Sequence, residues 1–163
     1  MTAGFLRQVI VFAVCASWFR LVPGRTATLA LLGLLSGGIF YLVINLSLSV
    51  ATNIGALAIA GQLGVPFALL LAIVVFRERI HWPRMLGIGL SILGVVLLVF
   101  DPSAAREGAG LALTALASLI WAITSLIQRR LVGVPVLTIY AWVGLMGSLV
   151  MAVVAMITEP VAM

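Results

Sequence analysis

Six residues within otherwise apolar segments could hold a small organic molecule by hydrogen bonding and ring contact. They are Tyr41, Asn45, Gln62, Pro66, Trp121 and Trp142. An amide placed in hydrocarbon is costly unless it is hydrogen-bonded, and aromatic rings can stack on a solute or form cation–π contacts. The chemistry that these residue types support is reversible binding. No nucleophile–base pair, phosphate loop or metal cluster accompanies them, so the sequence predicts no catalysis, no cofactor and no metal site.

The segments that carry these residues are too apolar for a soluble domain. Thr26 to Phe76 is a run of 51 residues without Asp, Glu, Lys or Arg. Because about 20 apolar residues cross the roughly 30 Å of hydrocarbon in a bilayer, this run predicts two crossings with a polar break at 51–53. Of the whole chain, 64% is hydrophobic and 8% charged, against about 25% charged in soluble domains. The sequence predicts an all-α, polytopic membrane helix bundle with six apolar segments, at about 5–20, 27–50, 54–76, 85–100, 109–128 and 136–158.

The polar and aromatic residues have particular places in these segments. Tyr41 and Asn45 are four residues apart and share one helix face, so Asn45 is expected to point into the bundle. Trp121 lies in a short polar stripe at 121–125, and Trp142 lies in the first half of the last segment. Tryptophan is also common as an anchor near the ends of spans, an alternative that Trp121, nearer mid-span, fits less well.

The sequence around Pro66 predicts an opening in the middle of its span. Proline removes the backbone hydrogen bond to about Gln62, and its ring opens the helix there. Gly61 and Gly64 would let the helix bend. Because a freed carbonyl in lipid must face protein or a wet cavity, we expect a lumen at this point. The alternative is a passive kink in which Gln62 bonds a neighbouring helix.

Glycines in two segments have the spacing of close helix packing. Gly33 and Gly37 form a GxxxG pattern, which lets helix backbones approach each other, and Gly38 follows. The same packing role is predicted for the glycines of the fourth segment, which are Gly87, Gly89 and Gly94.

The acidic residues lie outside the middle of every predicted segment. Asp101 and Glu107 flank one connection and are predicted to lie in a solvated loop, and Glu78 is predicted to pair with a neighbouring arginine. Buried carboxylates are the usual proton or cation relays of pumps, and this signature of coupled transport is missing.

The distribution of arginine predicts the topology. Basic residues stay preferentially in the cytoplasm. One set of alternate connections holds seven of the nine basic residues, and the other set holds two, Arg7 and Arg106. The segments 20–26, 77–84 and 129–135 are therefore predicted inside and both termini outside, which is most simply explained by one more helix ahead of Met1. A cleaved signal peptide in the first segment is the alternative. The net charge of +5 reflects these topology signals, so nucleic acid is not predicted as a partner.

Two passages resemble the EamA-type transporters of the drug/metabolite transporter superfamily. The first is GVPFA at 64–68, leading into FRERIHWPRMLGIGLSILGV at 76–95. It is similar to the end of an EamA repeat, where a helix with a mid-span proline precedes an Arg-Glu-Arg turn and a glycine-spaced helix. The second runs from Gly110 to Arg130, with IWA at 120–122 and QRRL at 128–131, followed by Ala141 and Trp142. It resembles the opening of the family's other repeat.

The resemblance implies a ten-span fold built from two five-helix repeats of inverted topology. Residues 1–104 would supply the last four helices of the first repeat and 105–163 the first two of the second. The family moves small organic metabolites or drugs by alternating access, and repeat transporters hold the solute near the bilayer midplane. On this basis Gln62 and Asn45 would bond the solute, and Trp121 and Trp142 would form apolar walls. Tyr41 and Pro66 would also line the site.

Other functions stay open from the sequence. The chain departs from the family in lacking a second Arg-Glu-Arg turn with its glycine-spaced helix, so one alternative is a truncated or degenerate membrane protein without transport, or a partner subunit. A small-multidrug-type exporter is disfavoured because its buried Glu in the first helix is absent, and a membrane enzyme because no polar residues cluster at one interface. The expected partners are the lipid bilayer and a small-molecule substrate, the expected location is the bacterial inner (plasma) membrane, and assembly as a homo-oligomer is left open.

Overall fold

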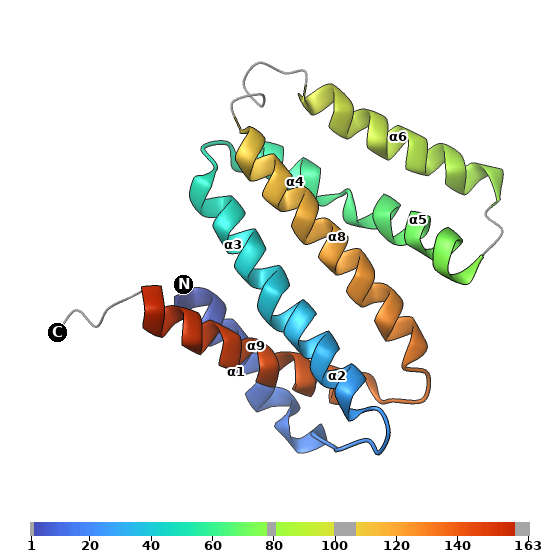
Figure 1. Ribbon diagram of the computed structural model, residues 1–163. Helices are drawn as coiled ribbons and strands as arrows, with labels where there is room; N and C mark the ends of the chain where they lie inside the picture. The colour runs from blue at the N-terminus through green and yellow to red at the C-terminus, as the bar shows by residue number, and fades with distance from the viewer. Residues whose placement is uncertain (1, 78–80, 100–106, 159–163) are drawn as a thin grey trace. The chain divides into compact units, whose positions relative to one another are not determined.

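The computed structural model describes residues 2–77, 81–99 and 107–158, and every regular element in these ranges is a helix. In chain order the elements are α1 (Thr2–Cys15), η1 (Ala16–Trp18), α2 (Thr26–Gly33), the π-helical η2 (Leu34–Ile39), α3 (Phe40–Val50), α4 (Ile54–Gly61), α5 (Gly64–Phe76), α6 (Trp82–Val99), α8 (Gly108–Arg130) and α9 (Val136–Thr158) (Figure 1). The prediction of an all-α fold is confirmed. Glu78 and Asp101, for which a local ion pair and a solvated loop were predicted, lie outside the described residues.

Within the residues that the structure describes, four helices are long and apolar enough to cross a membrane. They are Thr26–Val50, which joins α2, η2 and α3, Ile54–Phe76, which joins α4 and α5, Gly108–Arg130 and Val136–Met156. The first and fourth predicted segments form shorter apolar helices, Leu6–Trp18 and Met85–Leu97. Large apolar side chains point outward along the helices, with Val74 75% and Met156 83% exposed, which suits contact with lipid. The chain is a membrane protein.

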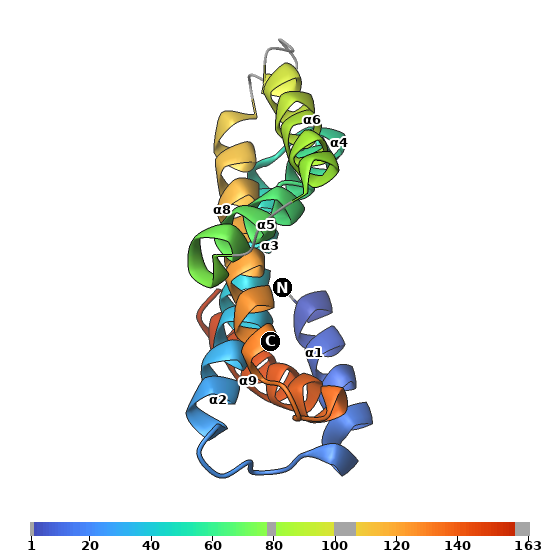
Figure 2. The same cartoon turned by 90° about the vertical axis from the view of Figure 1, so that its right-hand side faces the viewer.

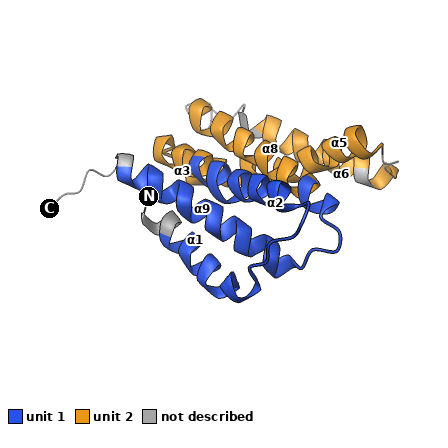
Figure 3. Cartoon of the chain, turned by 60° about the horizontal axis from the view of Figure 1, so that its bottom comes forward, with its two compact units in different colours: residues 1–42, 127–163 blue, residues 43–126 orange. Residues whose placement is uncertain are grey.

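The chain forms two compact units, which Figure 3 shows in blue and orange. Unit 1 contains the described parts of 1–42 and 127–163. Within it α1 and α2 pack against α9, and α1 runs beside α9 in both Figure 1 and Figure 2. The buried core of unit 1 consists of Leu29, Leu32, Leu131, Ile139, Trp142 and Val143.

A glycine-lined crossing holds α2 and η2 against α9. A Cβ built on Gly37 would lie 2.2 Å from the carbonyl oxygen of Val143, and one built on Gly147 would lie 2.7 Å from the carbonyl oxygen of Gly37. Gly33 is similarly close to the α9 backbone. The buried side chain of Gln8 on α1 donates a hydrogen bond from Nε2 to the Gly37 carbonyl, at 3.2 Å. The close-packing role predicted for Gly33 and Gly37 is confirmed, because no side chain fits between these backbones.

Unit 2 contains the described parts of 43–126, which are most of α3 and α8 together with α4, α5 and α6. Hydrogen bonds join α8 to α3 through Ser47 and to α4 through Gly61. In this unit α6 contacts α5 and α4. The boundary predicted between residues 104 and 105 separates sequence repeats, whereas these units are defined by contacts in the structure. The repeat boundary therefore stays a prediction.

The prediction that the glycines of α6 mediate helix packing was wrong for the part of the chain described here. A Cβ built on Gly87, Gly89 or Gly94 meets no atom within 4 Å. The physical reason is that α6 contacts its neighbours through other positions, such as the buried Ile88. Glycine spacing alone cannot show which face of a helix is covered.

Candidate functional site

The span Ile54–Phe76 in unit 2 is broken in its middle, as the position of Pro66 predicts. α4 ends at Gly61, and the backbone N–H groups of Gln62 and Leu63 donate to carbonyls three residues earlier, at 3.0 Å each. The N–H of Val65 bonds the Gln62 carbonyl at 3.2 Å, whereas an unbroken helix would direct it to Gly61. Pro66 has no N–H to offer. The break therefore leaves the Gly61 carbonyl without its helical donor.

A hydroxyl from α8 supplies the missing donor. Ser118 Oγ donates to the Gly61 carbonyl oxygen at 3.2 Å. The indole of Trp121, one turn further along α8, lies against the start of α5, because a Cβ on Gly64 would come within 3.0 Å of its Cε3. A carbonyl in the middle of a span needs a partner of this kind. Ser118 and Trp121 of α8 thus contact the helix break from one side.

Removing this hydroxyl is expected to loosen the break. Ser118→Ala should lower the free energy of local opening by about 1–3 kcal/mol, because it removes the donor to a mid-span carbonyl at a depth where lipid offers no other. Hydrogen exchange at the amides of 62–67 would measure the change. The control is Ser125→Ala, since among the described residues Ser125 Oγ bonds the Trp121 carbonyl of its own helix and no other helix. Equal exchange in the two variants would show that Ser118 does not hold the break.

A second polar contact joins α8 to α3. Ser47 Oγ donates to the Gly110 carbonyl oxygen at 2.8 Å and lies 2.7 Å from Thr114 Oγ1. Because the single proton of Ser47 goes to Gly110, Thr114 donates to Ser47. Both hydroxyls are fully buried. Sequence reasoning missed Thr114 and Ser118, although small polar residues four positions apart on α8 were the signal that could have found them.

Glu107 corrects a second expectation. Its side chain is 5% exposed and accepts hydrogen bonds from the backbone N–H groups of Thr52 and Asn53, at 3.0 Å each, and from the Thr52 hydroxyl. It is therefore not solvated, because the turn between α3 and α4 covers it. The Thr52 hydroxyl bond, and then the two backbone bonds, hold the pKa of this carboxyl below its ordinary value of 4.5 although burial opposes them.

This arrangement predicts a pH-dependent contribution to stability. Glu107 lies just before the span that begins at Gly108, and its pKa is lower in the folded than in the unfolded chain. The carboxylate therefore stabilises the fold above pH 4.5, and this contribution is lost as the pH falls through the folded pKa. The difference in thermal midpoint between the wild type and Glu107→Gln should be constant above pH 4.5 and shrink below it. A difference that did not change with pH would contradict this role.

The six predicted site residues are divided between the units. In unit 2, Gln62 is exposed at the break, Pro66 is buried, Trp121 is 43% exposed beside the break and Asn45 is half-buried on α3. The structure brings Gln62, Pro66 and Trp121 together at the break.

The other two residues belong to unit 1. Trp142 is buried in the core and donates from Nε1 to the Arg20 carbonyl at 3.3 Å. Tyr41 is half-buried, with the Arg7 guanidinium carbon 4.8 Å from its ring centre. For all six residues the solute-binding role stays a prediction.

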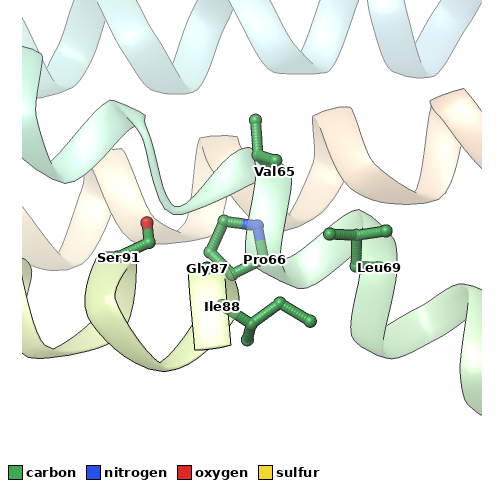
Figure 4. A pocket seen from close by; sticks show the side chains of 6 residues that line it. All are labelled: Val65, Pro66, Leu69, Gly87, Ile88 and Ser91. Atoms are coloured by element: carbon green, nitrogen blue, oxygen red, sulfur yellow. The ribbon is translucent and has the colours of Figure 1, made fainter. Parts of the chain in front are cut away.

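A cavity of about 300 Å³ lies beside the break, between α5 and α6. Its lining residues are Val65, Pro66, Leu69, Gly87, Ile88 and Ser91 (Figure 4). Among the described residues, the cavity walls carry no charged group, and the Ser91 hydroxyl is the polar side-chain group in this lining. This arrangement can hold an uncharged group.

The chain is similar to one curated protein, "Protein PecM" from Dickeya dadantii (strain 3937). The two are 29% identical over 135 residues, which are 81% of this chain and 45% of that protein. The chain thus spans less than half the length of the curated relative that it matches. No family model matches the chain. No solved structure matches it either.

Proposed function

We propose that the protein is a multi-pass transporter that moves small organic metabolites or drugs by alternating access, as part of a ten-span, inverted-repeat fold similar to that of the EamA-type transporters. In this proposal the chain lies in the bacterial plasma membrane, performs no catalysis, and has lipid and a small solute as partners. The resemblance of 64–95 and 110–142 to that family supports the proposal.

The observation that carries the proposal is the broken helix in the middle of an apolar span. The span Ile54–Phe76 is interrupted at Gln62, whose side chain is exposed. Broken spans with polar groups at their ends are the usual place for solute sites in repeat transporters. A span that served only to anchor the protein would have no need of a break that requires Ser118 to satisfy its carbonyl.

A flux assay on membrane vesicles tests this function. Vesicles from cells that express the protein, and from cells that do not, would be loaded with a panel of neutral, anionic and cationic organic solutes. The proposal expects at least one solute to cross faster when the protein is present. Identical rates across the panel, with the protein shown to be in the membrane, would favour the alternative of a membrane protein without transport.

A further inference from the structure

We propose that the cavity beneath Pro66 is a binding site for a compact, uncharged apolar group, which is the apolar part of the transported solute. This inference rests on the proposed function in one respect, which is that the ligand is the transported solute. The site itself follows from the structure of unit 2. It lies between α5, directly after the break, and α6 (Figure 4).

The size of the cavity limits the ligand. Its volume of about 300 Å³ is at the lower end of small-molecule sites, which span about 300–1,000 Å³. An apolar cavity of about 150 Å³ is already enough for benzene. The site therefore has room for one substituted ring or a short branched chain, and a larger solute would place only part of itself there.

The lining of the cavity limits the charge of the ligand. Val65, Pro66, Leu69 and Ile88 present hydrocarbon, and none of the described lining residues could neutralise a charge. An ion without a partner in such surroundings would lose its hydration and gain nothing in return. The Ser91 hydroxyl can donate one hydrogen bond to a ligand and can also accept one. The chemistry thus fits a neutral group with at most one or two polar atoms.

Gly87 is the position in the lining at which the cavity can be altered by substitution. It lines the cavity, and a Cβ built on it meets no atom within 4 Å. We expect a larger side chain at this position to occupy space that a ligand would need, because its Cβ meets no neighbour. Gly94 on the same helix also has open space around it but does not line the cavity. The two glycines form a matched pair for a test.

The test is photolabelling of the purified intact protein in lipid nanodiscs. The probe is a diazirine-bearing benzyl alcohol, and the labelled positions are read by mass spectrometry. We expect saturable labelling within 65–69 or 87–91 that unlabelled benzyl alcohol displaces. Gly87→Phe should raise the probe concentration for half-maximal labelling at least about tenfold. Gly94→Phe should leave that concentration unchanged. The smaller Gly87→Ala, expected to have an intermediate effect, serves if the phenylalanine variant does not fold.

Three outcomes would overturn the inference. Labelling that benzyl alcohol does not displace would identify a surface that lipid chains cover. Equal labelling by an analogue of the probe that carries a trimethylammonium group in place of the hydroxyl would contradict the requirement for a neutral ligand. Equal loss in Gly87→Phe and Gly94→Phe would place the binding elsewhere. The proposed function fails separately: displaceable labelling at the cavity in a protein that moves no solute would retain the binding site and reject transport.

Discussion

Gly37→Ala is expected to destabilise unit 1 by about 1–3 kcal/mol or more, as overpacking of a filled interior does. The added Cβ would lie 2.2 Å from the Val143 carbonyl oxygen. This oxygen belongs to the backbone of α9, so the clash cannot be relieved by rotating a side chain. To make room, α9 would have to move away from α2 and η2, and the Gln8 bond to the Gly37 carbonyl would be disturbed as well.

The chain offers its own reporter for this change. Cys15 is the single cysteine of the sequence and is buried in unit 1. Its reaction with a thiol-specific fluorescent dye during heating in detergent should begin at a lower temperature in Gly37→Ala. Gly94→Ala is the control, because its Cβ meets open space and alanine improves helix propensity by up to about 1 kcal/mol. If both variants exposed Cys15 at the wild-type temperature, the crossing would not be as tight as the structure shows.

Gln62→Leu is expected to abolish transport while leaving membrane insertion unchanged. The Gln62 amide is exposed at the break, near the middle of a 23-residue span. An amide at this depth needs a hydrogen-bond partner, and under the proposed function that partner is the solute. Leucine has a similar size and is favourable in hydrocarbon. The substitution therefore removes the solute bond without harming the span.

Solute flux and the amount of protein in the membrane would be measured together for this variant. Gln128→Leu is a matched control, because it makes the same change at an exposed position near the end of α8. Normal flux in Gln62→Leu would remove Gln62 from the site. A loss of flux together with a loss of inserted protein would indicate the alternative role, in which Gln62 bonds a neighbouring helix.

The features that the sequence predicts well depend on neighbours along the chain. Apolar length predicts the helices, the proline at 66 predicts the break, and the spacing of Gly33 and Gly37 predicts close packing. Each of these follows from backbone geometry within one or two turns. The six segments are accordingly found as helices within the described residues, with four of them long enough to cross a membrane.

The features that the sequence does not predict depend on distant partners. Ser118 bonds a carbonyl 57 positions away, and Glu107 bonds a turn about 55 positions away. Nothing local distinguishes Glu107 from a solvated loop residue, and nothing local distinguishes Gly94, which meets no other helix here, from Gly37, which does. The arrangement of the helices does not determine whether the six candidate residues bind a solute, so this role is addressed by the flux and labelling experiments.

The donor and the acceptor of the Ser118–Gly61 hydrogen bond differ in whether they need water when the bond is broken. In a helix a serine hydroxyl can also bond the carbonyl four residues earlier, which for Ser118 is that of Thr114. If α4 and α8 moved apart, the hydroxyl would therefore keep an acceptor, whereas the Gly61 carbonyl would lose its donor. Only water or a donor group on a solute could replace it at this depth. Separation of these two helices and wetting of the mid-membrane should consequently occur together.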